Sequence, residues 1–217
     1  MKLFHQYFEI FGDEVNRELY RLALSKNDNF SLSKTSFSKH YPEWRQSKVI
    51  YDREFNLFKI KIEEEIKRRL PEVLEMLEVR KFEIASFEVQ LTSHNDGEFY
   101  KWHRDNSTAG TASRVVTFVY YFNAIPKKFS GGELVIYHHD GQESFIEPLN
   151  DSMIFFNSAT KHEVKPVICP SKLFEDGRFT LNGWIRKRQS ITKNDEYFGY
   201  NIFKPYANSL ARKTWLL

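Results

Sequence analysis

Residues 97–106 read Gly97-Glu-Phe-Tyr-Lys-Trp-His-Arg-Asp-Asn106 and contain the pattern His-x-Asp at His103 and Asp105. On an extended strand, residues two apart project from the same face. The His103 imidazole and the Asp105 carboxylate can therefore close on one metal ion. Downstream lie an isolated His162 and then Arg178, which opens an apolar run. Two histidines and one carboxylate are the ligand set of non-haem Fe(II) sites that keep open positions, so this order of residues predicts a metal centre.

The composition bounds the class of protein. The chain has 217 residues, of which 41% are apolar, enough for one well-filled domain. The formal net charge is +3 with both signs interspersed, which is weak support for nucleic-acid binding. The single cysteine, Cys169, excludes an internal disulfide and is compatible with a reducing compartment. No signal peptide or long apolar run is visible. We therefore expect a cytoplasmic protein that is not associated with a membrane.

The first third of the chain has helical periodicity. Apolar residues recur at helical intervals over residues 11–24 and most clearly over residues 55–79. Pro71 falls inside the second stretch and predicts a kink or a break between two helices. Residues 27–38 are polar and read as a loop. We therefore expect residues 1–80 to form a helical buttress packed on a sheet.

Residues 81–186 contain short β-prone runs instead of helices. The strongest is Arg114-Val-Val-Thr-Phe-Val-Tyr-Tyr-Phe-Asn123, and Asp140-Gly141 marks the turn of a hairpin. Short strands at regular spacing predict a mainly β fold, a sandwich or barrel that includes the double-sheet jelly roll. The basic, aromatic tail 187–217 is expected to pack on this core, which makes residues 1–217 a single domain.

Residues 93–186 resemble the prolyl 4-hydroxylase-type branch of the 2-oxoglutarate- and Fe(II)-dependent dioxygenases. The resemblance covers somewhat under half of the chain, with its motifs in the family's order. The matching motifs are Tyr100-Lys-Trp-His-Arg-Asp105, Arg114 to Asn123, Ser130-Gly-Gly-Glu-Leu134, Phe155-Phe-Asn-Ser158, His162-Glu-Val-Lys-Pro166 and Arg178-Phe-Thr-Leu-Asn-Gly-Trp184. It implies a double-stranded β-helix, a jelly roll of the cupin type buttressed by the N-terminal helices, with the metal inside its open end.

The resemblance also implies roles for individual residues. His103, Asp105 and His162 would bind Fe(II). Arg178 would pair with the distal carboxylate of 2-oxoglutarate, because a guanidinium presents a planar, permanently charged fork. Tyr121 matches a tyrosine that hydrogen-bonds the same carboxylate. The implied cofactors are Fe(II), the co-substrate 2-oxoglutarate and O2, with ascorbate as a stimulant.

Other residues of the motifs have weaker assignments. Tyr100 is a further candidate for the co-substrate site. Trp102, Arg104 and Trp184 are candidates for substrate contact. The aromatic residues among them are equally compatible with a packing role in the core or at the rim.

The sequence contains one alternative metal-binding pair and departs from the family pattern at two places. His138 and Asp140 also fit His-x-Asp, but at a hairpin tip their side chains are expected to point to solvent. The interval from His162 to Arg178 is longer than usual, which indicates an inserted loop at 169–176. We expect this loop and residues 106–113 to form a lid over the opening. Where prolyl hydroxylases often have a tyrosine ahead of the metal strand, this chain has Ser93-His94.

The expected activity is hydroxylation of an amino-acid side chain, prolyl in the first instance, in a peptide or protein. A free amino acid or a small natural-product intermediate is the alternative substrate. A nucleic-acid demethylase is disfavoured, because such relatives carry a second arginine six positions after the first and this chain has Trp184 there. A non-catalytic jelly-roll module that retains the metal site is the alternative of a different class.

Overall fold

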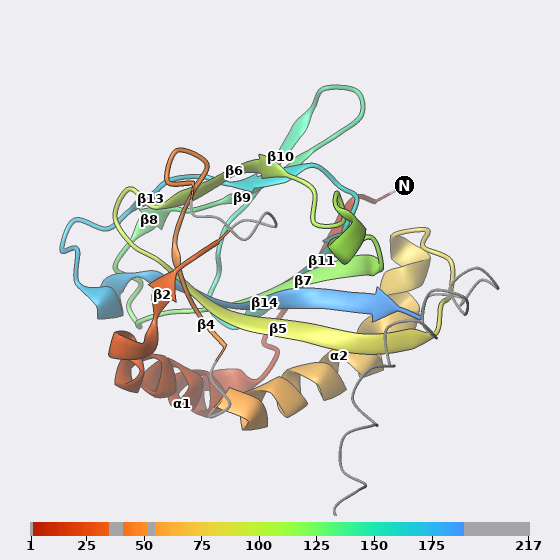
Figure 1. Cartoon of the computed structure of the whole chain (residues 1–217). Coiled ribbons are helices and arrows are strands. Elements are labelled where there is room, and N and C mark those ends of the chain that lie inside the picture. The colour runs from red at the N-terminus through yellow and green to blue at the C-terminus, as the bar shows by residue number, and fades with distance from the viewer. Residues whose placement is uncertain (1, 35–40, 52–54, 189–217) are drawn as a thin grey trace, which may run out of the picture. The chain divides into compact units, whose positions relative to one another are not determined.

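The computed structural model describes residues 2–34, 41–51 and 55–188 (Figure 1). The chain divides into two compact units, residues 1–187 and 188–217, and the description below concerns the first. The expected packing of the tail on the core falls on residues 189–217, which lie outside the described part of the chain.

A seven-stranded antiparallel sheet is the larger of the two main layers of strands. Its strand order is β1-β11-β7-β14-β5-β4-β2. The bounds are β1 (Phe4–Phe8), β2 (Ser31–Leu32), β4 (Lys48–Ile50), β5 (Ile84–His94), β7 (Arg114–Phe122), β11 (Ser152–Asn157) and β14 (Arg178–Lys187). The long strands β5, β7 and β14 form its centre.

A five-stranded antiparallel sheet faces the first (Figure 1) and has the order β10-β9-β12-β6-β3. Its strands are β3 (Arg45–Gln46), β6 (Phe99–His103), β9 (Leu134–Tyr137), β10 (Glu143–Ile146) and β12 (His162–Val164). Strands β8 (Ser130–Gly131) and β13 (Val167–Ile168) pair with each other. From β5 to β14 the chain crosses repeatedly between the two main sheets, apart from the β9–β10 hairpin within the small sheet and the separate pair β8–β13, and this arrangement confirms the expected double-stranded β-helix.

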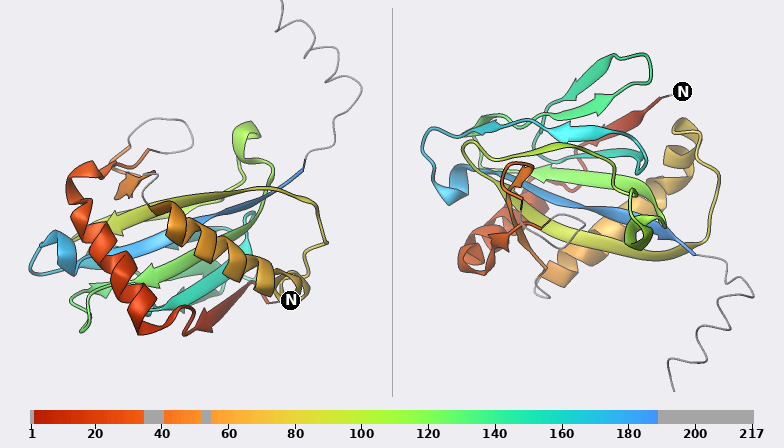
Figure 2. Two further views of the ribbon diagram at one scale, coloured as in Figure 1. Left: turned by 90° about the horizontal axis from the view of Figure 1, so that it is seen from below. Right: turned by 45° about the horizontal axis from the view of Figure 1, so that its top comes forward.

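Two helices cover the outer face of the large sheet, as Figure 2 shows from below. They are α1 (Gly12–Ser25) and α2 (Asn56–Met76). Strand β7 explains the packing, because its residues alternate between two faces. Phe118, Tyr120 and Phe122 are fully buried in one cluster with helix residues such as Ile62 and Ile66. The other face of the strand is left to line the space between the sheets.

Two expectations about the N-terminal region were wrong. Residues 1–80 are not purely helical, because β1 and β4 complete the large sheet by pairing with β11 and β5. Segments of three to five residues are too short to show a clear period of their own. Pro71 does not divide α2, which continues to Met76, so the expected break is wrong and the expected kink stays a prediction. The proline lies on the exposed face of the helix, where water can bond the carbonyl that loses its partner.

Candidate active site

Three metal-binding side chains meet between the two sheets. His103 ends β6, His162 begins β12, and the two are direct cross-strand partners. Asp105 follows two residues after His103, and its backbone N–H donates to the Ser158 carbonyl over 2.9 Å. The Nε2 atoms of His103 and His162 lie 3.5 and 3.4 Å from the two oxygens of Asp105. Among the described residues this is the one group of three metal-binding side chains, and all of its ligand atoms lie within 4.8 Å of one another.

Backbone carbonyls fix the orientation of both imidazoles. Nδ1 of His103 lies 2.9 Å from the Lys101 carbonyl, and Nδ1 of His162 lies 2.8 Å from the Thr160 carbonyl. A carbonyl only accepts, so each Nδ1 carries the proton and each Nε2 presents a lone pair. This is the usual arrangement of metal-binding histidines. Burial, followed by the neighbouring His103, lowers the pKa of His162 to about 4, so His162 is neutral at physiological pH.

The Asp105 carboxylate is held in its ionised form. Burial alone raises its pKa, but His162, His103 and the Thr117 hydroxyl together outweigh burial and lower it. Thr117 of β7 donates to Oδ2 over 2.7 Å and lies 3.0 Å from the Ser158 hydroxyl. The large sheet thus supports a ligand that the small sheet presents.

The competing pair at the hairpin does not form a metal site. Nε2 of His138 lies 2.8 Å from the Ser144 hydroxyl, and Asp140 is exposed beyond the end of β9. Asp140 is exposed to solvent as expected, whereas His138 is half-buried because its imidazole contacts Ser144.

A buried cation, Arg178, lines the cavity between the sheets that also contains the three metal-binding side chains. Arg178 is only 2% exposed, and its guanidinium carbon lies 5.0 Å from the centre of the Tyr121 ring. Among the described residues it has no carboxylate partner, and the buried Arg178 Nε, Tyr121 hydroxyl and His94 Nε2 have no hydrogen-bond partner. A desolvated guanidinium without a counter-charge is strongly unfavourable. The group therefore fits an anion with oxygens directed at it, as the distal carboxylate of 2-oxoglutarate would be.

His94 stands beside Arg178 as its cross-strand partner. Its Nδ1 lies 3.4 Å from Nη1 of Arg178. An arginine only donates, so Nδ1 accepts and Nε2 carries the proton. Burial, Arg178 and Arg45 hold the pKa of His94 well below its usual range. His94 is therefore a neutral side chain whose N–H adds to the donors at this end of the cavity.

One cavity of about 530 Å³ connects the metal ligands with Arg178. Its large-sheet wall carries the inward residues of β5, β7 and β14. Its small-sheet wall carries Tyr100, Leu134 and Val164 together with the metal ligands. The volume falls in the range of sites that bind small molecules.

Most of the other residues expected at the site line this cavity. Tyr100 stacks on His103 with ring centres 3.6 Å apart, and Trp184 stacks under the guanidinium of Arg114 at 3.6 Å. Arg104 also lines the cavity, and its Nη1 donates to the Ala159 carbonyl. The structure does not bring Trp102 to the cavity. It is 49% exposed and packs against Trp44, because strand alternation turns it away from His103.

The two loops expected to form a lid have different positions. Thr111 of the 106–113 segment lines the cavity, but no residue of the 169–176 loop does. Asn95 donates to the Leu173 carbonyl over 2.9 Å, and Phe174 packs on Phe179. The loop precedes β14 at the Arg178 end and does not line the cavity, so its expected part in a lid stays a prediction.

The sequence did not indicate Gln90 as part of the cavity wall, and it placed Arg45 only near a segment, after the 27–38 loop, that could close over the opening. Arg45 and Gln90 are buried, at 9% and 3% exposure, and both line the cavity. The available signal for Gln90 was a polar residue at an inward position of an alternating strand. Arg45 lies in a two-residue strand that carries no periodic pattern of its own.

Comparison with known proteins relates the chain to a family. The sequence model of the 2OG-Fe(II) oxygenase superfamily matches residues 89–186, which include all three ligands and Arg178. An uncharacterized PKHD-type hydroxylase of Synechocystis sp. is 41% identical over 186 residues, or 82% of this chain. Residues 89–186 of the chain match the 2OG-Fe(II) oxygenase superfamily. The chain spans 61% of the length of the Synechocystis relative.

Solved structures of this superfamily share the fold. A Pseudomonas putida prolyl-4-hydroxylase superposes with a TM-score of 0.64 at 20% identity, covering 86% of this chain and 94% of that one. A Trichoplax adhaerens prolyl hydroxylase, in complex with a hypoxia inducible factor peptide fragment, gives 0.64 at 19% identity, covering 85% and 84%. Among the described residues of this chain, no helix is long and apolar enough to cross a membrane.

Proposed function

We propose that this protein is a hydroxylase of an amino-acid side chain, prolyl in the first instance, in a peptide or protein. One observation carries the proposal. Two neutral histidines and one carboxylate direct their lone pairs at a common point. They share a cavity with the buried Arg178, which has no carboxylate partner among the described residues. A binding module would not need to keep both parts of this arrangement.

Each group of cavity residues would have a separate role in the reaction. His103, Asp105 and His162 would hold Fe(II), and Arg178 with Tyr121 would hold the distal carboxylate of 2-oxoglutarate. Bound Fe(II) with 2-oxoglutarate supplies the oxidising power that converts a C–H bond into C–OH with O2. Leu134, Phe156 and Val164 form an apolar wall beside the ligands. They would exclude water and so suppress side reactions.

The prolyl assignment rests on likeness to proteins whose names specify that substrate, among them the P. putida and T. adhaerens enzymes. A free amino acid or a small natural-product intermediate is the second candidate, because a cavity of about 530 Å³ can hold a small molecule. Both candidates predict the same co-products, succinate and CO2.

The test is incubation of the purified protein with Fe(II), 2-oxoglutarate and either a prolyl peptide library or a deproteinised cell extract. We expect succinate release and products heavier by one oxygen atom. The metal-free variant His162→Ala is the control and should give neither. Absence of both signals with the wild-type protein in both pools would contradict the proposal and favour a non-catalytic module.

A further inference from the structure

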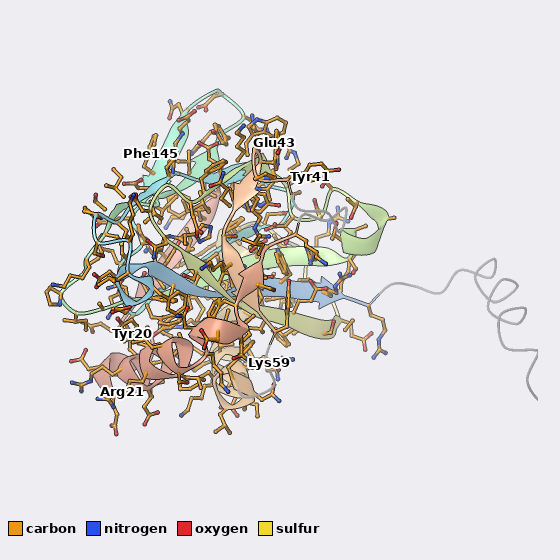
Figure 3. The ribbon with its side chains drawn as sticks, turned by 60° about the vertical axis from the view of Figure 1, so that its left-hand side comes forward. Tyr20, Arg21, Tyr41, Glu43, Lys59 and Phe145 are labelled. Atoms are coloured by element: carbon orange, nitrogen blue, oxygen red, sulfur yellow. The ribbon has the colours of Figure 1, made fainter. Side chains whose placement is uncertain are left out.

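The cavity contains a second buried arginine that the proposed chemistry does not use. Arg45 of β3 is the cross-strand partner of Tyr100, and its guanidinium carbon lies 4.6 Å from the centre of that ring. Its Nε donates to the Ser47 hydroxyl over 3.0 Å, and Nη1 donates to the Lys34 carbonyl over 3.3 Å. Figure 3 shows the turn with Tyr41 and Glu43 that leads into β3, on the side opposite Tyr20 of α1.

No carboxylate of the described residues pairs with Arg45. Burying a guanidinium without a counter-charge is unfavourable, so the position is best explained by an anion that binds there. Neutral contacts such as Ser47 and the Lys34 carbonyl position the fork but do not balance its charge. The same reasoning identified Arg178 as a carboxylate partner.

The cavity lining carries more positive than negative side chains, which favours binding of a second anion in addition to 2-oxoglutarate. Of the residues that the structure describes, six cationic side chains line it, against the two carboxylates Glu88 and Asp105, and one of the six, Lys59, pairs with Glu63 outside the lining. Glu88 is already paired with Arg114 and Arg186. A divalent metal and a 2-oxoglutarate dianion cancel each other, so they do not reduce this positive excess. The cationic lining residues are Lys34, Arg45, Lys59, Arg104, Arg114 and Arg178.

Unpartnered donors lie out of reach of 2-oxoglutarate. Among the described residues, Gln90 Nε2 and Trp184 Nε1 are buried without a hydrogen-bond partner, and Gln90 Oε1 accepts from the Tyr51 hydroxyl over 2.9 Å. Gln90 is four residues from His94 and Trp184 is six from Arg178, which is roughly 13 and 20 Å along the strands. A five-carbon diacid spans roughly 6 Å, given C–C bonds of about 1.5 Å. These donors therefore face a second ligand.

We propose that Arg45, assisted by Gln90, binds a carboxylate of the primary substrate, which is therefore a carboxylic acid. The inference rests on the proposed function and narrows its substrate class. A guanidinium fork matches the two oxygens of a carboxylate. The carboxylate is supplied either by a free acid or peptide C-terminus, or by an acidic side chain beside the oxidised residue.

The first experiment separates Arg45 from the co-substrate site. Binding of 2-oxoglutarate to Mn(II)-loaded protein is measured by calorimetry for the wild type, Arg45→Gln and Arg178→Gln. We expect Arg178→Gln to weaken binding by tenfold or more and Arg45→Gln to change it by less than about threefold. Equal weakening by both substitutions would overturn the proposal, because Arg45 would then serve 2-oxoglutarate. Melting temperature and Mn(II) content establish that each variant is folded, and Arg45→Lys replaces Arg45→Gln if the latter is not.

The second experiment uses the wild-type protein and needs no variant. Oxygenated products from the cell extract and from a peptide digest are separated on an anion exchanger after incubation with Fe(II) and 2-oxoglutarate. We expect products that carry a carboxylate, and we expect amidation of that carboxylate to reduce turnover by tenfold or more. A C-terminally amidated peptide and an Asp-to-Asn peptide distinguish the two sources of the carboxylate. Oxygenated products that lack a carboxylate would overturn the inference, whereas absence of any product and of succinate would count against the proposed function instead.

Discussion

The hydroxyl of Thr117 donates to Oδ2 of Asp105 over 2.7 Å, so a strand of the large sheet orients a metal ligand that follows a strand of the small sheet. Thr117→Val removes this donor at nearly constant volume. Outer partners of metal ligands typically contribute tenfold to hundredfold in metal affinity, so we expect a loss of that size. Thr117→Ser keeps the hydroxyl and should stay close to wild type. Fe(II) or Mn(II) titration measures both, and equal affinity of the valine variant would show that the contact does not support the ligand.

His162→Ala should abolish metal binding and turnover while the fold persists. The imidazole is one of only three protein ligands, so its loss leaves two. The matched control is His138→Ala at the hairpin, where the imidazole contacts Ser144 instead. Metal content by elemental analysis and succinate release measure the effect. If His162→Ala retains wild-type iron, the ligand assignment is wrong.

Arg178→Ala should raise the Michaelis constant for 2-oxoglutarate by about tenfold or more. Each charge-assisted hydrogen bond contributes about 1.5–3 kcal/mol, and a guanidinium can make two to one carboxylate. Arg178→Lys should recover only part of the loss, because an ammonium lacks the fork. Arg186→Ala is the comparison, since that arginine pairs with Glu88. An unchanged constant in Arg178→Ala would place the carboxylate elsewhere.

Gly132→Ala should weaken 2-oxoglutarate binding from a distance. A Cβ at Gly132 would lie 2.8 Å from Cδ of Arg178 and 2.9 Å from Cγ2 of Val167, so the arginine must shift. Gly141→Ala is the control, because Gly141 also has a positive φ but nothing lies within 4 Å of its Cβ. Both variants should lose about 1–2 kcal/mol of stability from the left-handed backbone. Only Gly132→Ala should also raise the constant for 2-oxoglutarate, and equal constants in both would contradict the contact.

Stability should fall as the pH drops below about 6.5, partly through His94. Burial, Arg178 and Arg45 hold its pKa well below the ordinary value of 6.5 in the folded protein. The unfolded chain therefore binds more protons in the window below 6.5, and acid shifts the equilibrium toward it. His94→Asn, whose Oδ1 can still accept from Arg178, should reduce the loss of stability between pH 7.5 and 5.5. Urea unfolding measures this, with the exposed His139→Asn as control, and an identical loss in all three proteins would refute the effect.

The sequence was most informative where a motif and a strand coincide. The His-x-Asp spacing predicted that His103 and Asp105 would reach one metal ion, and they do lie together, although β6 ends at His103 and Asp105 lies in the turn that follows. Arg178 could be placed from its position at the head of an apolar run. The pairing of His162 with His103 could not be read from the sequence, because it depends on which strands become neighbours in the small sheet.

The predictions from the sequence were wrong where strands are short and where the direction of a side chain was not considered. The two- to five-residue strands of the N-terminal region take their structure from partners far along the chain, so local periodicity does not reveal them. Trp102 adjoins His103 in sequence but faces the opposite side of β6, which alternation alone could have predicted.

The burial of Cys169, the one cysteine in the chain, has a practical use for spectroscopy. The turn between β9 and β10 is exposed at Asp140, outside the cavity lining. Asp140→Cys would therefore create a single accessible thiol that takes a fluorophore or spin label without blocking the metal. Such a label would report distances to Mn(II) and allow the association of co-substrate and substrate to be followed separately.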